Sequence, residues 1–500
     1  MAQLLLVFAL LGAVSAQWDP NTAYNRQAMV HLFEWKWSDI ANECESYLGP
    51  YGFGGVQVSP PNEHAVIWIP FRPWWERYQP VSYELTSRSG NDGDFRDMVT
   101  RCNNVGVRIY VDAVINHMAR ESGTGSAGHS FSNYNFPSSW NFNVPNGKCS
   151  TSSGKIENYQ DANQVRNCNL LHLNDIDLSN SFSQRKVVNF MNYMIGIGVA
   201  GFRVDAVKHM WPGDLQLIYG SLNNLNTQWF LSGSRPFIVQ EVIDQGGEPI
   251  KATDYDHLGR VTEFKYGLEL GNAFHGNNQL KWLKNFGEAW SFLSDGAALA
   301  FIDNHDNQRG HGGGGGIVTH ADPRMYKMAN AYMLAWPYGF TRVMSSYYFR
   351  NGDSGPPSDC KGNTKSPTFD SNGACELSSG WVCEHRWRQI RNMVGFRNAA
   401  AGQNVVNWWD NGNNQIAFGR GNKAFIAING DTYTMTQALQ TGLPSGTYCN
   451  VILADYQNGK CVGDGGSNGP TITVDGSGFA TFSVGTGDDP VAAIHINAKM

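Results

Sequence analysis

The sequence predicts an α/β protein, a closed (β/α)8 TIM barrel with an irregular inserted domain after its third strand and a C-terminal antiparallel β domain. Eight apolar strand candidates recur between helical stretches, which is the number that a closed barrel needs. Their strand–helix–strand order continues to about residue 400, which argues against a β-sandwich. Several of them run directly into carboxylate, His, Asn and Arg side chains, as buried parallel strands do when their ends open into a polar site.

The strand candidates are short and apolar, as expected for strands buried on both faces. We expect them at residues 29–33, 55–58, 108–114, 201–205, 237–242, 261–264, 299–303 and 340–344.

Four polar segments stand at or after the ends of these candidates, at residues 112–117, 201–209, 241–244 and 301–306. In a (β/α)8 barrel the C-terminal ends of all strands meet at one mouth, so Asp205, Glu241 and Asp306 should converge although they lie far apart in the chain. Two carboxyl groups can protonate a leaving oxygen and stabilise a cationic sugar ring. Three carboxylates at one mouth therefore indicate glycoside chemistry.

Two stretches depart from the barrel pattern. From Asn116 to about Asp177 the chain is rich in Ser, Gly and Asn and is too long for a plain connection. From about Gln403, short alternating segments such as 424–429, 480–484 and 491–496 indicate antiparallel β structure. We therefore assign residues 17–115 and 177–403 to the barrel, 116–176 to the inserted domain and 404–500 to the C-terminal domain.

The N-terminal segment and the absence of a later long apolar stretch predict a secreted protein. Residues 1–16 have a short apolar core and a small residue at Ala16, which predicts a signal peptide cleaved before Gln17, a residue that can cyclise to pyroglutamate. No later stretch is apolar for long enough to span a bilayer, so we expect an extracellular protein with no membrane partner.

The net charge of −6, with dispersed basic residues, gives no electrostatic footprint for nucleic acid. Nine cysteines indicate disulfides with one thiol left over, and spacing alone does not fix their pairing.

The four polar segments, in this order, resemble the four signature regions of the α-amylase family of glycoside hydrolases. The resemblance covers nearly all of the mature chain and includes residues 74–78, 311–316 and 339–344. The last pattern is similar to that of the animal-type, chloride-dependent α-amylases. It implies a monomeric, endo-acting hydrolase of α-1,4-glucosidic bonds, with starch, glycogen and malto-oligosaccharides as substrates. The five consecutive glycines beside His311 predict a mobile loop at the barrel mouth, with a surface linker as the alternative.

The resemblance assigns roles to the three carboxylates. Asp205 is then the nucleophile of a retaining mechanism, and Glu241 is the general acid that later serves as base. Asp306 is expected to grip the hydroxyls of the reacting sugar and favour its distorted form. The alternative is that the three residues are separate strand-end caps or ion pairs.

A set of aromatic and basic residues is implied to bind substrate. His117 and His305 are expected at the sugar cleaved at the centre of the site, and Lys208 and His209 on the leaving side. Trp75 and Tyr78 are expected to stack on sugars on the non-reducing side, with Trp74 beside them. The alternatives are a structural role for the histidines and core packing for Trp74.

The resemblance also implies two bound ions. The family's calcium positions match Asn116, Arg166, Asp175 and His209, with Arg166 and His209 contributing backbone carbonyls because an Arg side chain cannot coordinate a cation. This Ca2+ would be structural, tying the inserted domain to the barrel.

The family's chloride positions match Arg203, Asn304 and Arg342, which would hold Cl− as an activator. The alternative is that both arginines pair with buried carboxylates.

The animal enzymes also suggest a disulfide pairing. It joins Cys44 with Cys102, Cys149 with Cys168, Cys375 with Cys383, and Cys449 with Cys461, and leaves Cys360 unpaired. A further bridge of the vertebrate members should be absent, because Thr86 stands where one partner would be.

Two other functions remain open at this stage. One is an α-glucosidase or transglycosylase of the same family that works on chain ends, which a product profile from long amylose would separate. The other is a catalytically inactive barrel kept as a glycan-binding protein. Such a barrel tends to lose its carboxylates, whereas all three are present in this sequence.

Overall fold

The structure is a computed structural model that describes residues 16–500. The predicted signal peptide, residues 1–16, lies outside the described residues apart from its last position. Within the described part of the chain, no helix is both long and apolar enough to cross a membrane.

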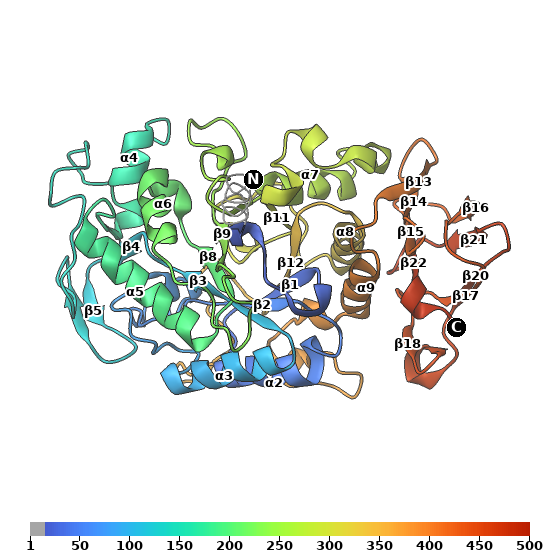
Figure 1. The fold of residues 1–500 in the computed structure, drawn as a ribbon, viewed down its shortest axis with the longest axis horizontal. Helices are drawn as coiled ribbons and strands as arrows, with labels where there is room; N and C mark the ends of the chain where they lie inside the picture. The colour runs from blue at the N-terminus through green and yellow to red at the C-terminus, as the bar shows by residue number, and fades with distance from the viewer. Residues whose placement is uncertain (1–15) are drawn as a thin grey trace, which may run out of the picture.

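Eight parallel strands close into a barrel in the order β1-β12-β11-β10-β9-β8-β3-β2 (Figure 1). Their bounds are β1 Ala28–Leu32, β2 Gly55–Val58, β3 Arg108–Ala113, β8 Gly201–Val204, β9 Phe237–Gln240, β10 Arg260–Thr262, β11 Ala298–Phe301 and β12 Phe340–Ser345. Almost all of their residues are buried, because helices cover the outside and side chains fill the inside. All eight strand predictions are confirmed to within two residues.

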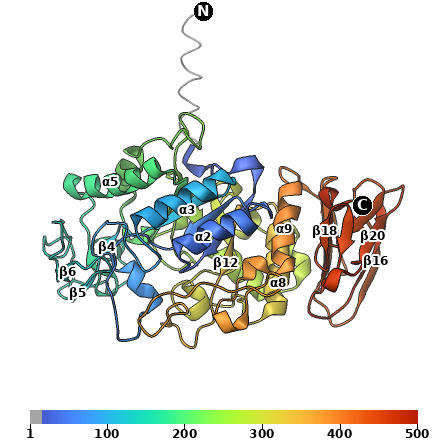
Figure 2. The same ribbon diagram turned by 90° about the horizontal axis from the view of Figure 1, so that it is seen from below.

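Helices surround the barrel (Figures 1 and 2). They are α2 Trp37–Glu43, α3 Asp92–Asn104, α5 Ser181–Ile197, α6 Pro212–Gly220, α7 Phe264–Phe274, α8 Pro323–Ala335 and α9 Arg388–Ala399. Local sequence sets their ends. Asn91 and Asp94 form a reciprocal capping box at the start of α3. Gly198 ends α5 with a φ of 118°, a left-handed conformation that glycine adopts without steric cost.

The chain leaves the barrel between β3 and β8. This excursion contains β4 His117–Met118, β5 Ser122–Thr124, β6 Ser130–Ser132, α4 Ala162–Asn167 and β7 Asn174–Asp175. Strand β4 pairs with β7 and places His117 opposite Asp175, so the start and end of the excursion lie side by side. The exact domain boundaries at 116 and 176 stay a prediction.

The C-terminal part is all β, as predicted. Strands β13 Val405–Asp410, β14 Gln415–Arg420, β15 Ala424–Asn429 and β22 Val491–His495 form one antiparallel sheet. The other strands of this part form three two-stranded sheets. They pair β16 Met435–Gln440 with β21 Phe479–Val484, β17 Gly446–Cys449 with β20 Thr471–Val474, and β18 Asp455–Gln457 with β19 Lys460–Val462. Alternate residues of β15 face two cores. Ile426 belongs to the barrel core, and Phe425 packs with Phe482 and Ile494 in a second core.

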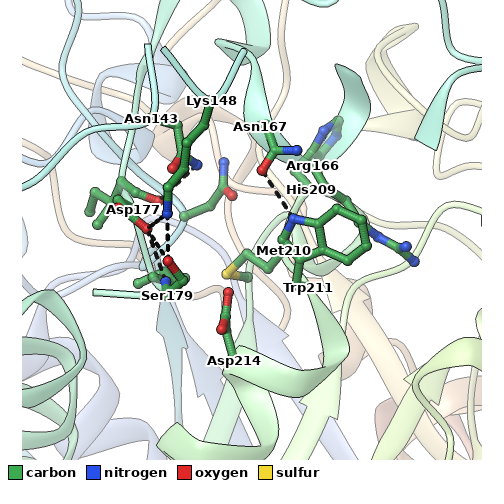
Figure 3. Close-up of a pocket in the computed structure, with 13 residues that line it drawn as sticks. Asn143, Lys148, Arg166, Asn167, Asp177, Ser179, His209, Met210, Trp211 and Asp214 are labelled. Atoms are coloured by element: carbon green, nitrogen blue, oxygen red, sulfur yellow. Dashed lines mark hydrogen bonds and ion pairs between the residues drawn. The ribbon is translucent and has the colours of Figure 1, made fainter. Parts of the chain in front are cut away.

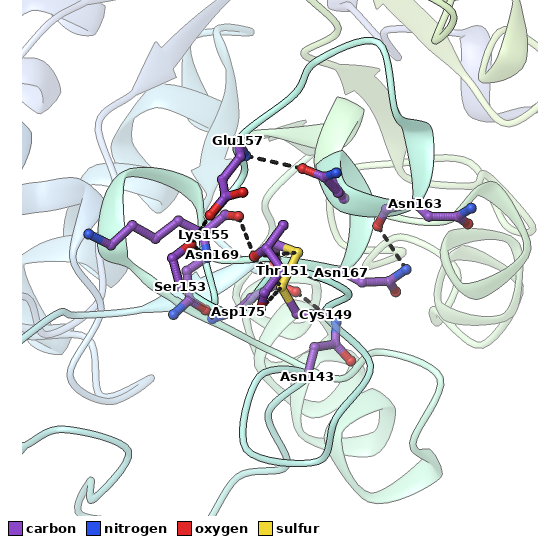
Figure 4. The surroundings of a disulfide bond; sticks show 12 residues. Asn143, Cys149, Thr151, Ser153, Lys155, Glu157, Asn163, Asn167, Asn169 and Asp175 are labelled. Atoms are coloured by element: carbon purple, nitrogen blue, oxygen red, sulfur yellow. Dashed lines mark hydrogen bonds between the residues drawn. A yellow bond between two sulfur atoms is a disulfide. The ribbon is translucent and has the colours of Figure 1, made fainter.

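Four disulfides join the pairs expected from the resemblance: Cys44–Cys102, Cys149–Cys168, Cys375–Cys383 and Cys449–Cys461. Cys360 is free and exposed. Figure 4 shows the Cys149–Cys168 bridge, where the hydroxyl of Thr151 donates to the carbonyl of Lys155 at 2.7 Å. Cys168 immediately follows α4, so this bridge fixes the end of the helix that carries Arg166.

Candidate active site

A cleft of about 500 Å3 opens at the C-terminal ends of the barrel strands. The three predicted carboxylates all line it, each in the segment that follows its strand. Asp205 follows β8, Glu241 follows β9, and Asp306 lies beyond the end of β11. The structure therefore brings the three residues together in one cleft, and their catalytic roles stay a prediction.

Arg203 joins the carboxylates into one cluster. Its Nη1 lies 2.6 Å from Oδ1 of Asp205 and 2.6 Å from Oδ1 of Asp112, and its Nη2 lies 2.6 Å from Oε1 of Glu241. Because one planar guanidinium contacts Asp205 and Glu241 through its two terminal nitrogens, these carboxylates are held side by side in a fixed orientation. Tyr78 completes the cluster by donating its hydroxyl to Asp112 at 2.8 Å.

The turn after Asp205 fixes the position of Glu241. Ala206 has a φ of 51°, an uncommon conformation for a residue with a Cβ, and its N–H donates to Oε2 of Glu241 at 2.8 Å. The backbone of Glu241 also accepts from the N–H of Val207 at 3.0 Å and donates to the carbonyl of Val204 at 2.9 Å. Glu241 is thus held by the end of β8 and by the turn that follows Asp205.

The cluster carries more carboxyl groups than it can ionise easily. Burial raises the pKa of Asp205 well above its usual range and raises that of Asp112, although Arg203 opposes both shifts. Burial, together with the charge of Glu241, raises the pKa of Asp306 to about 7. Since these groups lie against one another, a proton held at a raised pKa belongs to the cluster as a whole rather than to one carboxyl group. Acid catalysis of acetal cleavage requires such a proton next to an ionised carboxylate.

Asn304 shapes the loop that presents Asp306. Its side-chain oxygen accepts from the N–H of Asp306 at 3.1 Å and from that of Asn307 at 2.8 Å. Nε2 of His305 lies 3.5 Å from Oδ2 of Asp306, and burial lowers the pKa of His305 well below its usual value, so its ring is neutral. A neutral ring can donate from one nitrogen and accept at the other.

Aromatic rings form one wall of the cleft. His305 stacks on Tyr78 with a centroid distance of 5.1 Å, and Trp74 meets His305 edge to face at 5.4 Å. Trp74 is buried and donates its indole N–H to the carbonyl of Gly352 at 2.7 Å. It therefore serves core packing as well as lining the cleft, which was the alternative expected for it.

A second cavity of about 240 Å3 continues the cleft past Tyr78. Trp75, which is half-buried, lines it and is held by a hydrogen bond from its indole N–H to Asp353 at 3.0 Å. The guanidinium of Arg120 lies 5.7 Å from the Trp75 ring. Trp75 therefore offers the platform that stacking on a sugar requires.

The four basic residues predicted to bind substrate, His117, Lys208, His209 and His305, all line the cleft. Nε2 of His117 lies 2.9 Å from the carbonyl of Tyr78, and Nδ1 of His209 lies 2.9 Å from that of Val165. Burial lowers the pKa of each ring to about 4, so both are neutral and both already have a backbone partner. Lys208 donates to the carbonyl of Ile243 at 3.0 Å and forms an ion pair with Glu248.

Several lining residues escaped the sequence analysis. They are Tyr159, Leu170, Leu171, Leu173, Ile243, Gln245 and Glu248. All come from the inserted segment or from the loop after β9, and only Ile243 lies in a segment that the sequence analysis singled out, residues 241–244. The glycine-rich loop does reach the cleft, since His311, Gly312 and Gly313 line it, which favours the mouth-loop prediction over a surface linker.

The predicted calcium positions gather around a small cavity of about 60 Å3 (Figure 3). Asn116, Arg166 and His209 line it, and Asp175 lies beside it on β7. Across residues 16–500 no cluster of three His, Cys, Asp or Glu side chains could hold a metal, which is consistent with a site built mainly from amide and carbonyl oxygens.

The polar atoms beside this cavity fit a cation. Asp175 is buried without an ion-pair partner in the described chain, and burial raises its pKa well above the usual range. Asn143 donates to Oδ2 of Asp175 at 2.7 Å, yet its own Oδ1 is buried and has no partner. Nζ of Lys148, which also lines the cavity, forms an ion pair with Oδ1 of Asp177 at 2.6 Å rather than with Asp175. A buried carboxylate and an unpaired amide oxygen are ligands that a hard cation prefers.

The predicted chloride positions divide into two environments. Arg203 pairs with carboxylates, as its alternative interpretation expected. Arg342 forms no ion pair in residues 16–500 and donates only from Nη1 to Gln57, at 2.8 Å, while its Nε and Nη2 are buried without partners. Both ring nitrogens of His31 and Nε2 of Gln57 are also unpartnered. Nε and Nη2 of Arg342 and Nε2 of Gln57 are buried donors with no acceptor, and the ring of His31 can add one more, so the group suits a small anion.

Comparisons with known proteins agree with this geometry. A family model described as the alpha amylase catalytic domain matches residues 76–230, and one described as the alpha amylase C-terminal all-beta domain matches residues 406–497. The chain is 55% identical to the alpha-amylase of Oryzias latipes, with all of both chains covered. It is 56% identical to the pancreatic alpha-amylase of Homo sapiens, with 99% of each covered.

The structure is similar to that of wild-type alpha-amylase I from Eisenia fetida, with a TM-score of 0.90 and 50% identity over 95% of this chain and 98% of that one. A mutant of the same Eisenia fetida enzyme, solved in complex with maltohexaose, matches equally well.

Proposed function

Because the chain belongs to the α-amylase family, we propose that it is an endo-acting α-amylase that hydrolyses internal α-1,4-glucosidic bonds of starch and glycogen with retention of configuration. The observation that carries this proposal is the pair of carboxylates, Asp205 and Glu241, bridged by Arg203 at the floor of an open cleft. An open cleft lets a long chain lie across the site, as endo-cleavage requires.

In the proposed first step, protonated Glu241 gives its proton to the glycosidic oxygen while a carboxylate oxygen of Asp205 attacks the anomeric carbon. The bond from that carbon to the leaving oxygen breaks, and the departing glucan leaves as an alcohol. In the second step, Glu241 takes a proton from water, the water oxygen attacks the same carbon, and Asp205 is released. Two inversions at the anomeric carbon retain its configuration.

We assign the other residues of the cleft to binding the glucan chain. Asp306 and His305 are assigned to the hydroxyls of the reacting sugar, because both line the cleft beside the cluster. Trp75 and Tyr78 are assigned to stacking along the second cavity. Lys208 and His209, on the side of the inserted segment, are assigned to the leaving glucan. For His117 to contact a sugar through Nε2, its hydrogen bond to the Tyr78 carbonyl must be shared or exchanged.

We assign Ca2+ to Asn116, Asp175 and the backbone carbonyls of Arg166 and His209, and Cl− to Arg342, Arg203 and Asn304. The unpaired oxygens and donors described above support both assignments. Bound Ca2+ would supply the charge that buried Asp175 lacks and clamp the inserted segment to the barrel. Bound Cl− would supply a negative charge beside the carboxyl cluster. The four disulfides and the signal peptide predicted from the sequence support the proposal that the protein is secreted.

Product analysis tests the proposed function. With long amylose, an endo-acting enzyme should produce a broad range of malto-oligosaccharides early and reduce viscosity faster than it releases reducing ends. Release of glucose or a single short product from chain ends would instead favour the α-glucosidase or transglycosylase alternative, and no cleavage at all would favour the inactive glycan-binding barrel.

A further inference from the structure

A separate cavity of about 420 Å3 lies at the opposite end of the barrel, where β1, β10 and β12 begin. Four arginines from distant parts of the chain line it: Arg26, Arg260, Arg397 and Arg420. Arg420 is on β14 of the C-terminal sheet and Arg397 is on α9, and Nη2 of Arg420 donates to the carbonyl of Ala400, just beyond the end of α9, at 3.1 Å. The cavity therefore lies where the barrel meets the C-terminal sheet.

Backbone carbonyls hold these arginines in place. Arg397 donates to the carbonyls of Trp336 at 2.8 Å and Gly339 at 2.7 Å, and Arg420 donates to that of Ala335 at 2.5 Å. These acceptors lie at and just beyond the C-terminal end of α8, where helix carbonyls lack partners within the helix. The guanidiniums are therefore fixed in position before any ligand arrives.

Their positive charge is only partly neutralised by nearby carboxylates. None of the four arginines forms an ion pair with a carboxylate in the part of the chain that the structure describes. The only acidic residues among the lining residues are Asp19 and Asp295, so four positive and two negative groups leave a net charge of +2.

Burial makes this charge unfavourable. It lowers the pKa of Arg397 to about 10 and that of Arg420 to about 9, and the charge of Arg397 adds to the effect on Arg420. Both groups stay protonated at neutral pH, so a ligand of opposite charge would relieve their repulsion.

We propose that this cavity binds a small oxyanion of the phosphate or sulfate class. Guanidinium groups present several N–H donors in a planar fork that matches the oxygens of such anions. Arg260 uses Nε and Nη1 for the carbonyls of Trp18, Asp295 and Ala298, and its Nη2 has no protein acceptor among the described residues. The cavity is larger than one ion needs, so the same chemistry admits either free phosphate or a phosphate monoester.

Such an anion would act on stability rather than on turnover. It would lie between arginines of the barrel and of the C-terminal sheet and would bind the folded state only, so it should stabilise their junction by mass action. None of the cavity's lining residues belongs to the carboxyl cluster or to the cleft. Failure of this proposal would therefore leave the proposed catalytic function unaffected.

The first test is thermal unfolding of the whole protein in constant calcium and in chloride that already saturates the proposed chloride site, with added inorganic phosphate or with further sodium chloride at matched ionic strength. Phosphate should raise Tm along a saturable curve that sodium chloride does not reproduce. Arg260→Gln should lose this response, whereas Arg185→Gln, which removes an exposed arginine on α5, should keep it. A Tm response in Arg260→Gln equal to that of the wild type would overturn the proposal.

Glucose 6-phosphate in a parallel titration distinguishes the two sources of the anion. A response to both compounds supports a site that accepts esters, and a response to inorganic phosphate alone supports a site for the free ion. Absence of any response beyond that of the ionic-strength control overturns the proposal.

A crystallographic test needs no variant. Wild-type crystals soaked in selenate should show an anomalous peak among Arg260, Arg397 and Arg420. Anomalous peaks confined to other surfaces would contradict the assignment even if Tm rose.

Discussion

The N–H of Ala206 donates to Oε2 of Glu241 at 2.8 Å, so the residue after the proposed nucleophile positions the proposed acid. The two carboxylates are therefore coupled through the backbone turn at Ala206 as well as through Arg203. A change at either carboxylate should affect chemistry while leaving the barrel intact.

Glu241→Gln should fold normally and lose about 10²- to 10⁴-fold in kcat, because an amide of the same shape cannot protonate the leaving oxygen. Its side-chain oxygen can still accept from Ala206. The measurement is kcat on soluble starch together with Tm. Retention of more than about a tenth of wild-type turnover, when a general acid typically contributes at least 10²-fold, would show that another group supplies the proton.

Arg342→Gln should make activity insensitive to chloride. In the wild type, an anion among the unpartnered donors of Arg342 would place negative charge near the carboxyl cluster. Nearby negative charge makes proton loss harder, so the acid stays protonated to higher pH and chloride should extend activity on the alkaline side.

The measurement is kcat against pH for both proteins, with and without chloride. Bromide should replace chloride, and sulfate at matched ionic strength should not. If chloride activates the variant as strongly as the wild type, the ion-pair interpretation of these arginines replaces the chloride site.

Chelation of calcium should lower Tm and increase hydrogen exchange in residues 116–177, because buried Asp175 would lose its counter-charge. Added Mg2+ should restore little stability, since it requires near-octahedral geometry and gives up its water reluctantly. Differential scanning calorimetry and hydrogen exchange, with and without chelator, provide the comparison. Identical Tm values in the two conditions would refute the site.

Glu384, which does not line the cleft, should make the free energy of unfolding depend on pH. It is fully buried, and burial raises its pKa to about 7, whereas an unfolded glutamate titrates near 4.3. The folded state therefore binds more protons between these values, and stability that is present below about pH 4.3 is lost as pH rises towards 7. We expect this single group to reduce the free energy of unfolding by on the order of 3 kcal/mol across this pH range.

Glu384→Gln should remove that share of the slope, because an amide has no proton to lose and can still accept the N–H of Ser346 that the carboxylate accepts at 2.6 Å. Denaturant unfolding of wild type and variant from pH 5 to 8 checks this, with exposed Glu121→Gln as the matched control. Parallel pH profiles for wild type and Glu384→Gln would contradict the assignment.

The sequence predicted the barrel strands and the converging carboxylates because these features depend on local pattern. A buried strand must be apolar, and its polar end lies where the barrel opens. The same logic placed Asp205, Glu241 and Asp306 at one mouth without knowledge of their partners.

Other features depend on contacts between distant segments and left no local signal. The bridge from Arg203 to Asp112, Asp205 and Glu241 requires the barrel to be closed. Leu171 lines the cleft although nothing in its surroundings marks it, because the inserted segment folds back over the mouth. The arginine-lined cavity likewise combines residues 26, 260, 397 and 420 across the whole chain.

Trapping of a covalent glycosyl-enzyme tests the central claim most directly. Wild-type protein treated with a 5-fluoro-glucosyl fluoride should gain the mass of one fluorosugar, and peptide mapping by mass spectrometry should place that mass on Asp205. Asp205→Asn should gain no such mass. No adduct on the active wild type, an adduct on another residue, or the same adduct in Asp205→Asn would contradict the retaining mechanism proposed for this cleft.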